Sequence, residues 1–251
     1  MSMGGSVPIR NGLELDYCFV EAINSLLPVC DEVVICDSDS TDGTRQLIDD
    51  WAKREPKLTI CNFPWTDPVG TNEFFCEWLN YSRQHLSTTH FIHLDGDEVL
   101  FDQDYELVRN AHDAKATLYC KRLNFWRDHK SLIPEGHCCG HKVLRIAPTN
   151  MPIPSDYPWE PAAATMNQAV ESNIRIGHYG FLRRREQFFK KARVVQRMWV
   201  NSYDPRLEKA ESFDGNWMTM DGVTGWEKDL VDYTGSHPAA IQNWLKARNY
   251  E

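Results

Sequence analysis

The feature of this sequence that most restricts its fold is an alternation of strand and helix patterns over the first hundred residues. Short apolar runs rich in Val and Ile predict buried strands, and each is followed by apolar residues at helical spacing. Such alternation predicts an α/β fold, a mostly parallel sheet with helices on both faces. The predicted strands are Ser6–Ile9, Glu32–Cys36, Leu58–Cys61 and His90–Leu94, and the predicted helices are Tyr17–Leu27 (capped by Asp16), Gly43–Lys53 and Thr71–Leu86.

The second half of the chain is less regular, but no stretch of linker composition separates it from the first half. We therefore expect a single domain over residues 1–251. The segment Met151–Pro161 is predicted to be a loop because it is rich in proline. The other predicted elements are strands over Thr117–Arg122, Lys142–Ile146 and Ile174–His178, and helices over Arg184–Val200 and Ala239–Ala247.

Charge and the length of apolar runs argue against some classes of protein. The formal net charge of −9 disfavours broad binding to nucleic acid or anionic membranes. No apolar run has the length of a transmembrane helix and the N-terminus lacks a signal-peptide pattern, so we expect a cytoplasmic protein with free thiols. In His137-Cys138-Cys139-Gly140-His141, adjacent cysteines would chelate poorly, which favours buried thiols over a zinc site.

Two acidic loops follow directly on predicted strands. In Asp95-Gly96-Asp97-Glu98, two carboxylates with one residue between them can point into one cleft, and such oxygens are the ligands that Mg²⁺ and Mn²⁺ prefer. The loop Asp37–Asp42 makes a polar turn before the next helix. Taken singly, each loop could be no more than a solvated or capping turn. Because the carboxyl ends of parallel strands share one edge of a sheet, we expect the two loops to lie close together.

Together the loops resemble the family-2 glycosyltransferases. In that family a first strand ends in a Lys/Arg-Asn or Tyr-Asn pair, a later strand ends in Asp-x-Gly-Ser-Thr-Asp-Gly-Thr, and another ends in Leu-Asp-x-Asp-Glu. This chain has Arg10-Asn11, then Asp37-Ser-Asp-Ser-Thr-Asp-Gly-Thr44, then Leu94-Asp-Gly-Asp-Glu98. The resemblance covers residues 6–100 and continues more loosely to His178-Tyr179-Gly180.

The resemblance implies a GT-A fold, which is a Rossmann-like nucleotide-binding architecture. Residues 6–100 would be the nucleotide-binding half, and residues 101–251 the acceptor-side half with C-terminal helices. Asp37 matches the residue that contacts the nucleotide base, and Ile9, Arg10 and Asn11 would line the base pocket. Asp39 stands where the family has Gly, which implies a different turn geometry or an added contact to the ribose.

The resemblance also implies a divalent cation, Mn²⁺ or Mg²⁺. Asp95 and Asp97 match the metal motif, with Asp97 as the direct ligand and Asp95 contacting both donor and metal. His178, at a predicted strand end, would complete the metal shell, or else be a hydrogen-bonded structural residue. Arg183 begins a basic segment that would grip the donor diphosphate, or form a solvated helix face.

An inverting transferase of this type needs a carboxylate that takes the proton of the acceptor hydroxyl. We assign this role to Glu160 first and to Asp156 second, both in the proline-rich loop; the alternative is that they are solvated loop acids. The implied reaction moves a sugar from a uridine-diphosphate sugar, or another nucleotide-sugar, to an acceptor hydroxyl.

The acceptor would be a glycan or a lipid-linked saccharide, with a hydroxylated DNA base as the alternative. A sugar nucleotidyltransferase has the same fold and acidic cleft, but usually has a Gly-rich phosphate loop after its first strand. This chain has Arg10-Asn-Gly-Leu there. A non-catalytic binding module is a third possibility.

Overall fold

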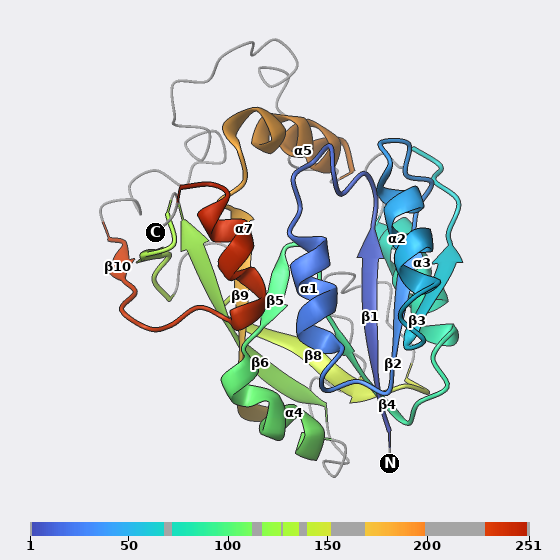
Figure 1. Ribbon diagram of the computed structural model, residues 1–251. Coiled ribbons are helices and arrows are strands. Elements are labelled where there is room, and N and C mark those ends of the chain that lie inside the picture. The colour runs from blue at the N-terminus through green and yellow to red at the C-terminus, as the bar shows by residue number, and fades with distance from the viewer. Residues whose placement is uncertain are drawn as a thin grey trace.

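The computed structural model describes residues 2–67, 72–111, 117–126, 128–135, 140–151, 169–198 and 229–249. Its centre is one mixed sheet in the order β10-β7-β6-β8-β4-β1-β2-β3, to which β5 and β9 are joined through β6 (Figure 1). The predicted α/β class is confirmed. The strands are β1 Met3–Ile9, β2 Glu32–Asp37, β3 Leu58–Asn62, β4 His90–His93, β5 Glu98–Leu100, β6 Leu118–Trp126, β7 Ser131–Leu132, β8 Lys142–Pro148, β9 Val170–Phe181 and β10 Val231–Asp232.

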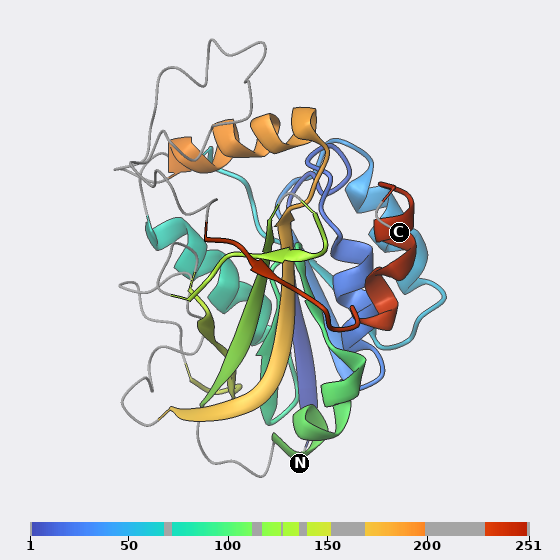
Figure 2. The same ribbon diagram turned by 90° about the vertical axis from the view of Figure 1, so that its left-hand side faces the viewer.

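The helices lie on both faces of the sheet and around its edges (Figures 1 and 2). Among the described residues, none of them is long and apolar enough to pass through a lipid bilayer. They are α1 Phe19–Leu26, α2 Thr44–Ala52, α3 Asn72–Gln84, α4 Tyr105–Asn110, α5 Arg185–Met198 and α7 Gln242–Lys246, with 3-10 turns at Asp102–Asp104 and Ala239–Ile241.

Strands β3, β2, β1 and β4 form the parallel part of the sheet. Side chains on β2 alternate between its two faces, as strand geometry requires. Val33 and Ile35 belong to the apolar cluster that contains Phe19 and Ile23 of α1, and Val34 and Cys36 belong to the cluster that contains Phe74 and Trp78 of α3. Helices therefore cover both faces of the sheet at β2, and this is why the segment Val33–Cys36 is apolar at every position.

The second half departs from a parallel sheet. Strand β8 pairs antiparallel with both β4 and β6. Strand β9 is twelve residues long, runs parallel to β6, and pairs antiparallel with the short β5. Strand β5 was not predicted, because three residues directly after an acidic turn carry no periodicity of their own. Its pairing with β9 places Glu98 opposite His178.

Several predicted element ends were wrong. Strand β1 has seven residues rather than four, and the predicted helix Ala239–Ala247 is a 3-10 turn followed by α7. Asp16 does not cap α1: it has φ +54°, and Cys18 precedes the helix without a side-chain cap. The Asp16 carboxylate instead accepts a hydrogen bond from the Arg184 amide at 2.8 Å and pairs with Arg248. Long-range partners therefore decided its conformation.

The carboxyl ends of β1, β2 and β4 meet at one edge of the sheet. Ser38 donates a hydrogen bond to the Ile9 carbonyl at 3.0 Å, and Leu94 donates one to the Ser6 carbonyl at 3.0 Å. The loops after β2 and β4 are therefore both anchored to β1. Helix α5 lies at this end of the sheet (Figures 1 and 2).

Candidate functional site

The acidic segment Asp95–Glu98 forms a tight turn between β4 and β5. The Glu98 amide donates to the Asp95 carbonyl at 2.9 Å, and the Asp97 carbonyl accepts from the Tyr179 amide of β9 at 2.8 Å. Gly96 allows close packing, because a Cβ there would lie 2.8 Å from Ile9 Cδ1 and the end of the Ile9 side chain would have to move. The turn is thus fixed between β1 and β9, and its acids point in different directions.

Asp97 is a buried carboxylate neutralised by two cations. Its Oδ2 accepts hydrogen bonds from Arg183 Nη2 at 2.6 Å and from Lys191 Nζ at 2.7 Å, and the residue is 4% exposed. Burial alone raises the pKa of Asp97, but the charges of Lys191 and Arg183 outweigh it and hold this pKa well below its usual value. The carboxylate is therefore ionised at neutral pH.

His178 presents a lone pair to Asp97. Its Nδ1 lies 3.0 Å from Asn124 Oδ1; because an amide oxygen only accepts, Nδ1 carries the ring proton and Nε2 does not. Burial lowers the pKa of His178 to about 4, so the ring is neutral at pH 7. Nε2 lies 3.7 Å from Asp97 Oδ1, so two electron-pair donors face each other with no proton between them.

Gly180 allows this approach. A Cβ at position 180 would lie 2.6 Å from His178 Nε2 and 2.7 Å from Asp97 Oδ2, so any side chain there would fill the space beside the pair. A carboxylate oxygen is a preferred ligand of Mn²⁺ and Mg²⁺, and a neutral imidazole nitrogen is a common metal ligand in proteins. Asp97 Oδ1 and His178 Nε2 are therefore candidate ligands for a divalent cation. Among the described residues, no group of three His, Cys, Asp or Glu side chains is arranged to hold a metal.

Asp95 and Glu98 belong to a separate ion-pair network. Arg145 of β8, 1% exposed, donates from Nη2 to Asp95 Oδ2 at 2.9 Å and to Glu98 Oε1 at 2.9 Å. Its Nε donates to Glu98 Oε2 at 3.0 Å, and Arg122 adds a contact to Glu98 Oε1 at 3.2 Å. The other Asp95 oxygen lies 3.1 Å from His93 Nε2. Both oxygens of Asp95 are therefore bound within the protein.

Asp37 lies at the end of β2 and is 1% exposed. Its Oδ2 accepts from the Ser40 amide at 3.2 Å, with Arg45 Nη1 at 4.0 Å. Its Oδ1 is buried and has no hydrogen-bond partner among the described residues. Burial raises the pKa of Asp37. A buried acceptor of this kind is a candidate for a donor group on a ligand, such as the N–H of a base.

The residues around Asp37 hold the loops after β1, β2 and β3 together. Asn11 has φ +48°; its amide donates to Ser40 Oγ and its Oδ1 accepts from the Thr41 amide, both at 2.8 Å. Asp39 has φ +49°, the left-handed conformation that Gly adopts readily. Its two oxygens accept from Asn62 Nδ2 at 2.9 Å and from the Trp65 amide at 2.7 Å.

Arg10 lies over an aromatic ring next to this loop. Its guanidinium carbon is 4.1 Å from the centroid of the Trp65 ring, and burial lowers its pKa. Ile9 is 2% exposed and pairs with Asp37 across β1 and β2. The predicted base-pocket residues Ile9, Arg10 and Asn11 thus all lie beside Asp37.

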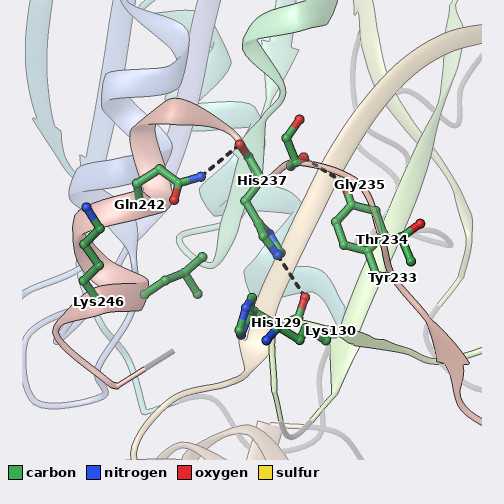
Figure 3. A pocket seen from close by; sticks show the side chains of 10 residues that line it. His129, Lys130, Tyr233, Thr234, Gly235, His237, Gln242 and Lys246 are labelled. Atoms are coloured by element: carbon green, nitrogen blue, oxygen red, sulfur yellow. Dashed lines mark hydrogen bonds between the residues drawn. The ribbon is translucent and has the colours of Figure 1, made fainter. Parts of the chain in front are cut away.

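A cavity lies between the turn that joins β6 to β7 and the C-terminal elements. It has a volume of about 700 Å³, and Figure 3 shows His237 in the middle of its lining, with Gln242 and Lys246 on the side of α7. His237 Nδ1 lies 2.9 Å from the Tyr179 hydroxyl, and His237 Nε2 lies 2.9 Å from the His129 carbonyl oxygen. None of the residues predicted for the donor or metal site lines this cavity.

Some predicted residues lie outside the described residues. These are Glu160 and Asp156, proposed as the base, and His137, Cys138 and Cys139 of the cysteine-rich segment. Within that segment His141 Nε2 lies 2.9 Å from the Ile133 carbonyl oxygen.

Two residues of the site were missed. Arg145 stands inside the apolar run of a predicted strand, and a buried arginine requires a carboxylate partner, so that signal was available. Lys191 carried no such signal, because one lysine in a basic helix looks like any other.

Comparisons with known proteins agree with this geometry. The sequence pattern described as Glycosyl transferase family 2 matches residues 8–133. A comparison with curated protein sequences finds no match.

Three solved structures are similar in fold. TarS 1-349 of S. aureus has a TM-score of 0.50 and 15% identity, covering 83% of this chain and 68% of that chain. The mannosyltransferase PcManGT from Pyrobaculum calidifontis, in complex with GDP-Man and Mn²⁺, has a TM-score of 0.50 and 15% identity, covering 99% and 84%. GalNAc-T7 with UDP, GalNAc and Mn²⁺ has a TM-score of 0.51 and 10% identity, covering 77% and 48%.

Proposed function

Because this chain belongs to glycosyl transferase family 2 and has the GT-A fold, it is a glycosyltransferase, and we propose that its donor is a nucleotide-diphosphate sugar and that it works with a divalent cation. The observation that carries the proposal is the pair Asp97 and His178, which lies at the same sheet edge as Asp37. One end of this edge suits a cation and a diphosphate, and the other suits a nucleoside.

The nucleoside half of the donor would lie against Ile9, Arg10 and Asn11, with the free Oδ1 of Asp37 accepting an N–H of the base. We propose a uridine nucleotide. GalNAc-T7 was solved with UDP, whereas PcManGT was solved with GDP-Man, so both bases belong in the test. Each Asp39 oxygen accepts one hydrogen bond, from Asn62 or from Trp65, and keeps a lone pair with which it could accept a ribose hydroxyl.

Asp97 and His178 would hold the cation, Mn²⁺ or Mg²⁺, which when bound stabilises the negative charge on the departing diphosphate as a Lewis acid. Mn²⁺ is present in the structures of PcManGT and GalNAc-T7. Asp95, predicted to contact both donor and metal, has a half-exposed side chain held by Arg145, and it would lie beside the cation. Arg183, predicted to grip the diphosphate, lies next to this position with its guanidinium on Asp97.

We propose an inverting single displacement. The acceptor oxygen forms a bond to the anomeric carbon while the bond from that carbon to the diphosphate oxygen breaks, and the nucleoside diphosphate leaves. The proton of the acceptor hydroxyl passes to a carboxylate, for which Glu160 is the first candidate and Asp156 the second. The acceptor class we propose is a glycan or a lipid-linked saccharide.

The first experiment measures thermal unfolding with UDP-sugars, GDP-sugars and nucleoside triphosphates, each with and without Mn²⁺. A ligand at about 100 times its Kd stabilises the native state by about 2.7 kcal/mol, which for a chain of this size raises the Tm by about 5–10 °C. We expect a Mn²⁺-dependent rise with one nucleotide-sugar.

Variants connect that rise to the site. Asp97→Asn should lose the Mn²⁺-dependent rise, while the matched Asp50→Asn on the exposed side of α2 should keep it. A rise for triphosphates alone would replace the transferase proposal with a nucleotidyltransferase. Glu160→Gln should abolish transfer and keep donor binding; normal turnover in this variant would move the base role to Asp156.

A further inference from the structure

The two cations on Asp97 differ in how firmly they are held. The Arg183 side chain is 1% exposed and is anchored to the main chain, since Nε donates to the Gly180 carbonyl at 2.7 Å and Nη1 donates to the Leu15 carbonyl at 2.8 Å. Its guanidinium also lies 4.3 Å from the centroid of the Tyr17 ring. These contacts would hold the Arg183 side chain in place even if its ion pair with Asp97 were lost.

Lys191 has no such anchors. Its side chain is 23% exposed and reaches Asp97 from α5 across the Tyr17 ring, whose centroid is 5.1 Å from Nζ. Among the described residues, its ammonium has no main-chain acceptor. A lysine on a flexible four-carbon stem can change partner without moving the backbone.

A cation held by Asp97 and His178 would lie close to the ammonium of Lys191. Asp97 Oδ2 is shared between Lys191 and Arg183, and Oδ1 lies 3.7 Å from His178 Nε2, so these groups lie within one small space. Like charges at this separation, in a site from which water is largely excluded, repel strongly. A diphosphate at the same place would offer Lys191 a new acceptor of higher charge than one carboxylate.

We propose that Lys191 is an exchangeable counter-ion: it binds Asp97 in the empty enzyme and moves to the diphosphate of the donor when the donor and the divalent cation bind. This inference rests on the proposed function. Lys191 then makes binding of the cation without nucleotide unfavourable and makes the two ligands bind cooperatively. Until a donor binds, Lys191 therefore occupies Asp97 and disfavours binding of the divalent cation there.

The test is direct Mn²⁺ binding, measured by the free-Mn²⁺ signal in electron paramagnetic resonance, without nucleotide and with saturating UDP or GDP. In the wild type, one of the two nucleotides should tighten Mn²⁺ binding by roughly 5- to 150-fold, the usual range for coupled sites. In Lys191→Met, Mn²⁺ alone should bind at least about tenfold more tightly, and the tightening by nucleotide should shrink accordingly.

Lys190→Met is the matched control. Lys190 is the neighbouring lysine on α5, and it contacts Glu14 at 3.5 Å and Glu186 at 3.6 Å rather than Asp97. It should bind Mn²⁺ as the wild type does. Lys191→Gln, which keeps a polar side chain, repeats the test should the Met variant unfold.

The outcomes separate the two proposals. Suppose that nucleotide tightens Mn²⁺ binding in the wild type, and that Lys191→Met has the same Mn²⁺ affinity and the same tightening. This result would overturn the counter-ion role and leave the proposed function standing. No Mn²⁺ binding by the wild type with either nucleotide would overturn both proposals. Equal effects of Lys190→Met and Lys191→Met would reduce the result to the general charge of α5, and this too would overturn the specific role of Lys191.

Discussion

Replacing Arg145 by Met should lower the unfolding free energy by about 3–5 kcal/mol, the usual effect of removing one partner from a buried ion pair. Arg145 is fully buried in β8 and makes two hydrogen bonds to Glu98 and one to Asp95. Glu98 is 0% exposed, so its charge cannot be hydrated once the guanidinium is gone. A methionine fills a similar volume, so the loss is electrostatic rather than a cavity.

The expected size follows from what remains around Glu98. Arg122 stays at 3.2 Å and the Asp95 amide stays at 3.1 Å, so the carboxylate keeps part of its compensation. The Asp95 side chain is 47% exposed and can turn to water, so its contribution is small. Glu98→Gln added to Arg145→Met removes the stranded charge and should recover about 1–2 kcal/mol.

The assay is urea unfolding of the single and double variants, analysed by linear extrapolation. Arg109→Met is the control, because Arg109 pairs with Glu106 on the exposed surface of α4 and should change stability by less than about 1 kcal/mol. A loss of less than about 1 kcal/mol in Arg145→Met, or a double variant less stable than that single variant, would show that an unpaired charge on Glu98 does not cause the loss of stability.

Three further predictions concern other parts of the site and its surroundings. Gly180→Ala places a methyl group against His178 and Asp97 and should weaken Mn²⁺ binding by about 10- to 100-fold, measured by titration, while thermal melting shows that the protein is still folded. An unchanged Mn²⁺ affinity would contradict the binding of a cation by this pair. Burial lowers the pKa of His237 to about 4, below the ~6.5 of an unfolded chain, so the unfolded state takes up the proton first as the pH falls. The contribution of His237 to the unfolding free energy is complete above pH ~6.5 and is lost as the pH falls to about 4, with a loss of about 2 kcal/mol between pH 7.5 and pH 5. In urea titrations at these two pH values, His237→Gln should show a smaller dependence on pH than the wild type. The same dependence in both proteins would rule out His237 as its cause. Trp65→Ala removes the ring under Arg10 and should weaken nucleotide binding by about 2- to 30-fold, whereas Trp65→Phe should retain most of it; calorimetry that finds no difference would place Arg10 outside the base pocket.

How much of the site was predictable differs from residue to residue. Asp37 and Asp97 follow from local rules, because Asp37 ends β2 and Asp97 lies in the turn after β4, and strand ends in such a sheet meet at one edge. His178 was predicted at a strand end, but it lies inside β9, which continues to Phe181 because it pairs with β5 and β6. The base candidates Glu160 and Asp156 stay predictions. Asp95 was grouped with Asp97 by spacing, but the turn points the two carboxylates to different partners.

The amino-acid sequence alone was enough to predict the alternation of elements, the parallel half of the sheet and the edge on which the acidic loops gather, because these depend on periodicity over a few neighbouring residues. The pairing of the charged side chains, in contrast, depends on how the whole chain is folded. Arg145 reaches Asp95 and Glu98 from β8, and Arg183 and Lys191 reach Asp97 from the segment after β9. Such pairs form between residues far apart in the chain, where the packing of strands and the loss of water fix the partner, and no local pattern records that choice.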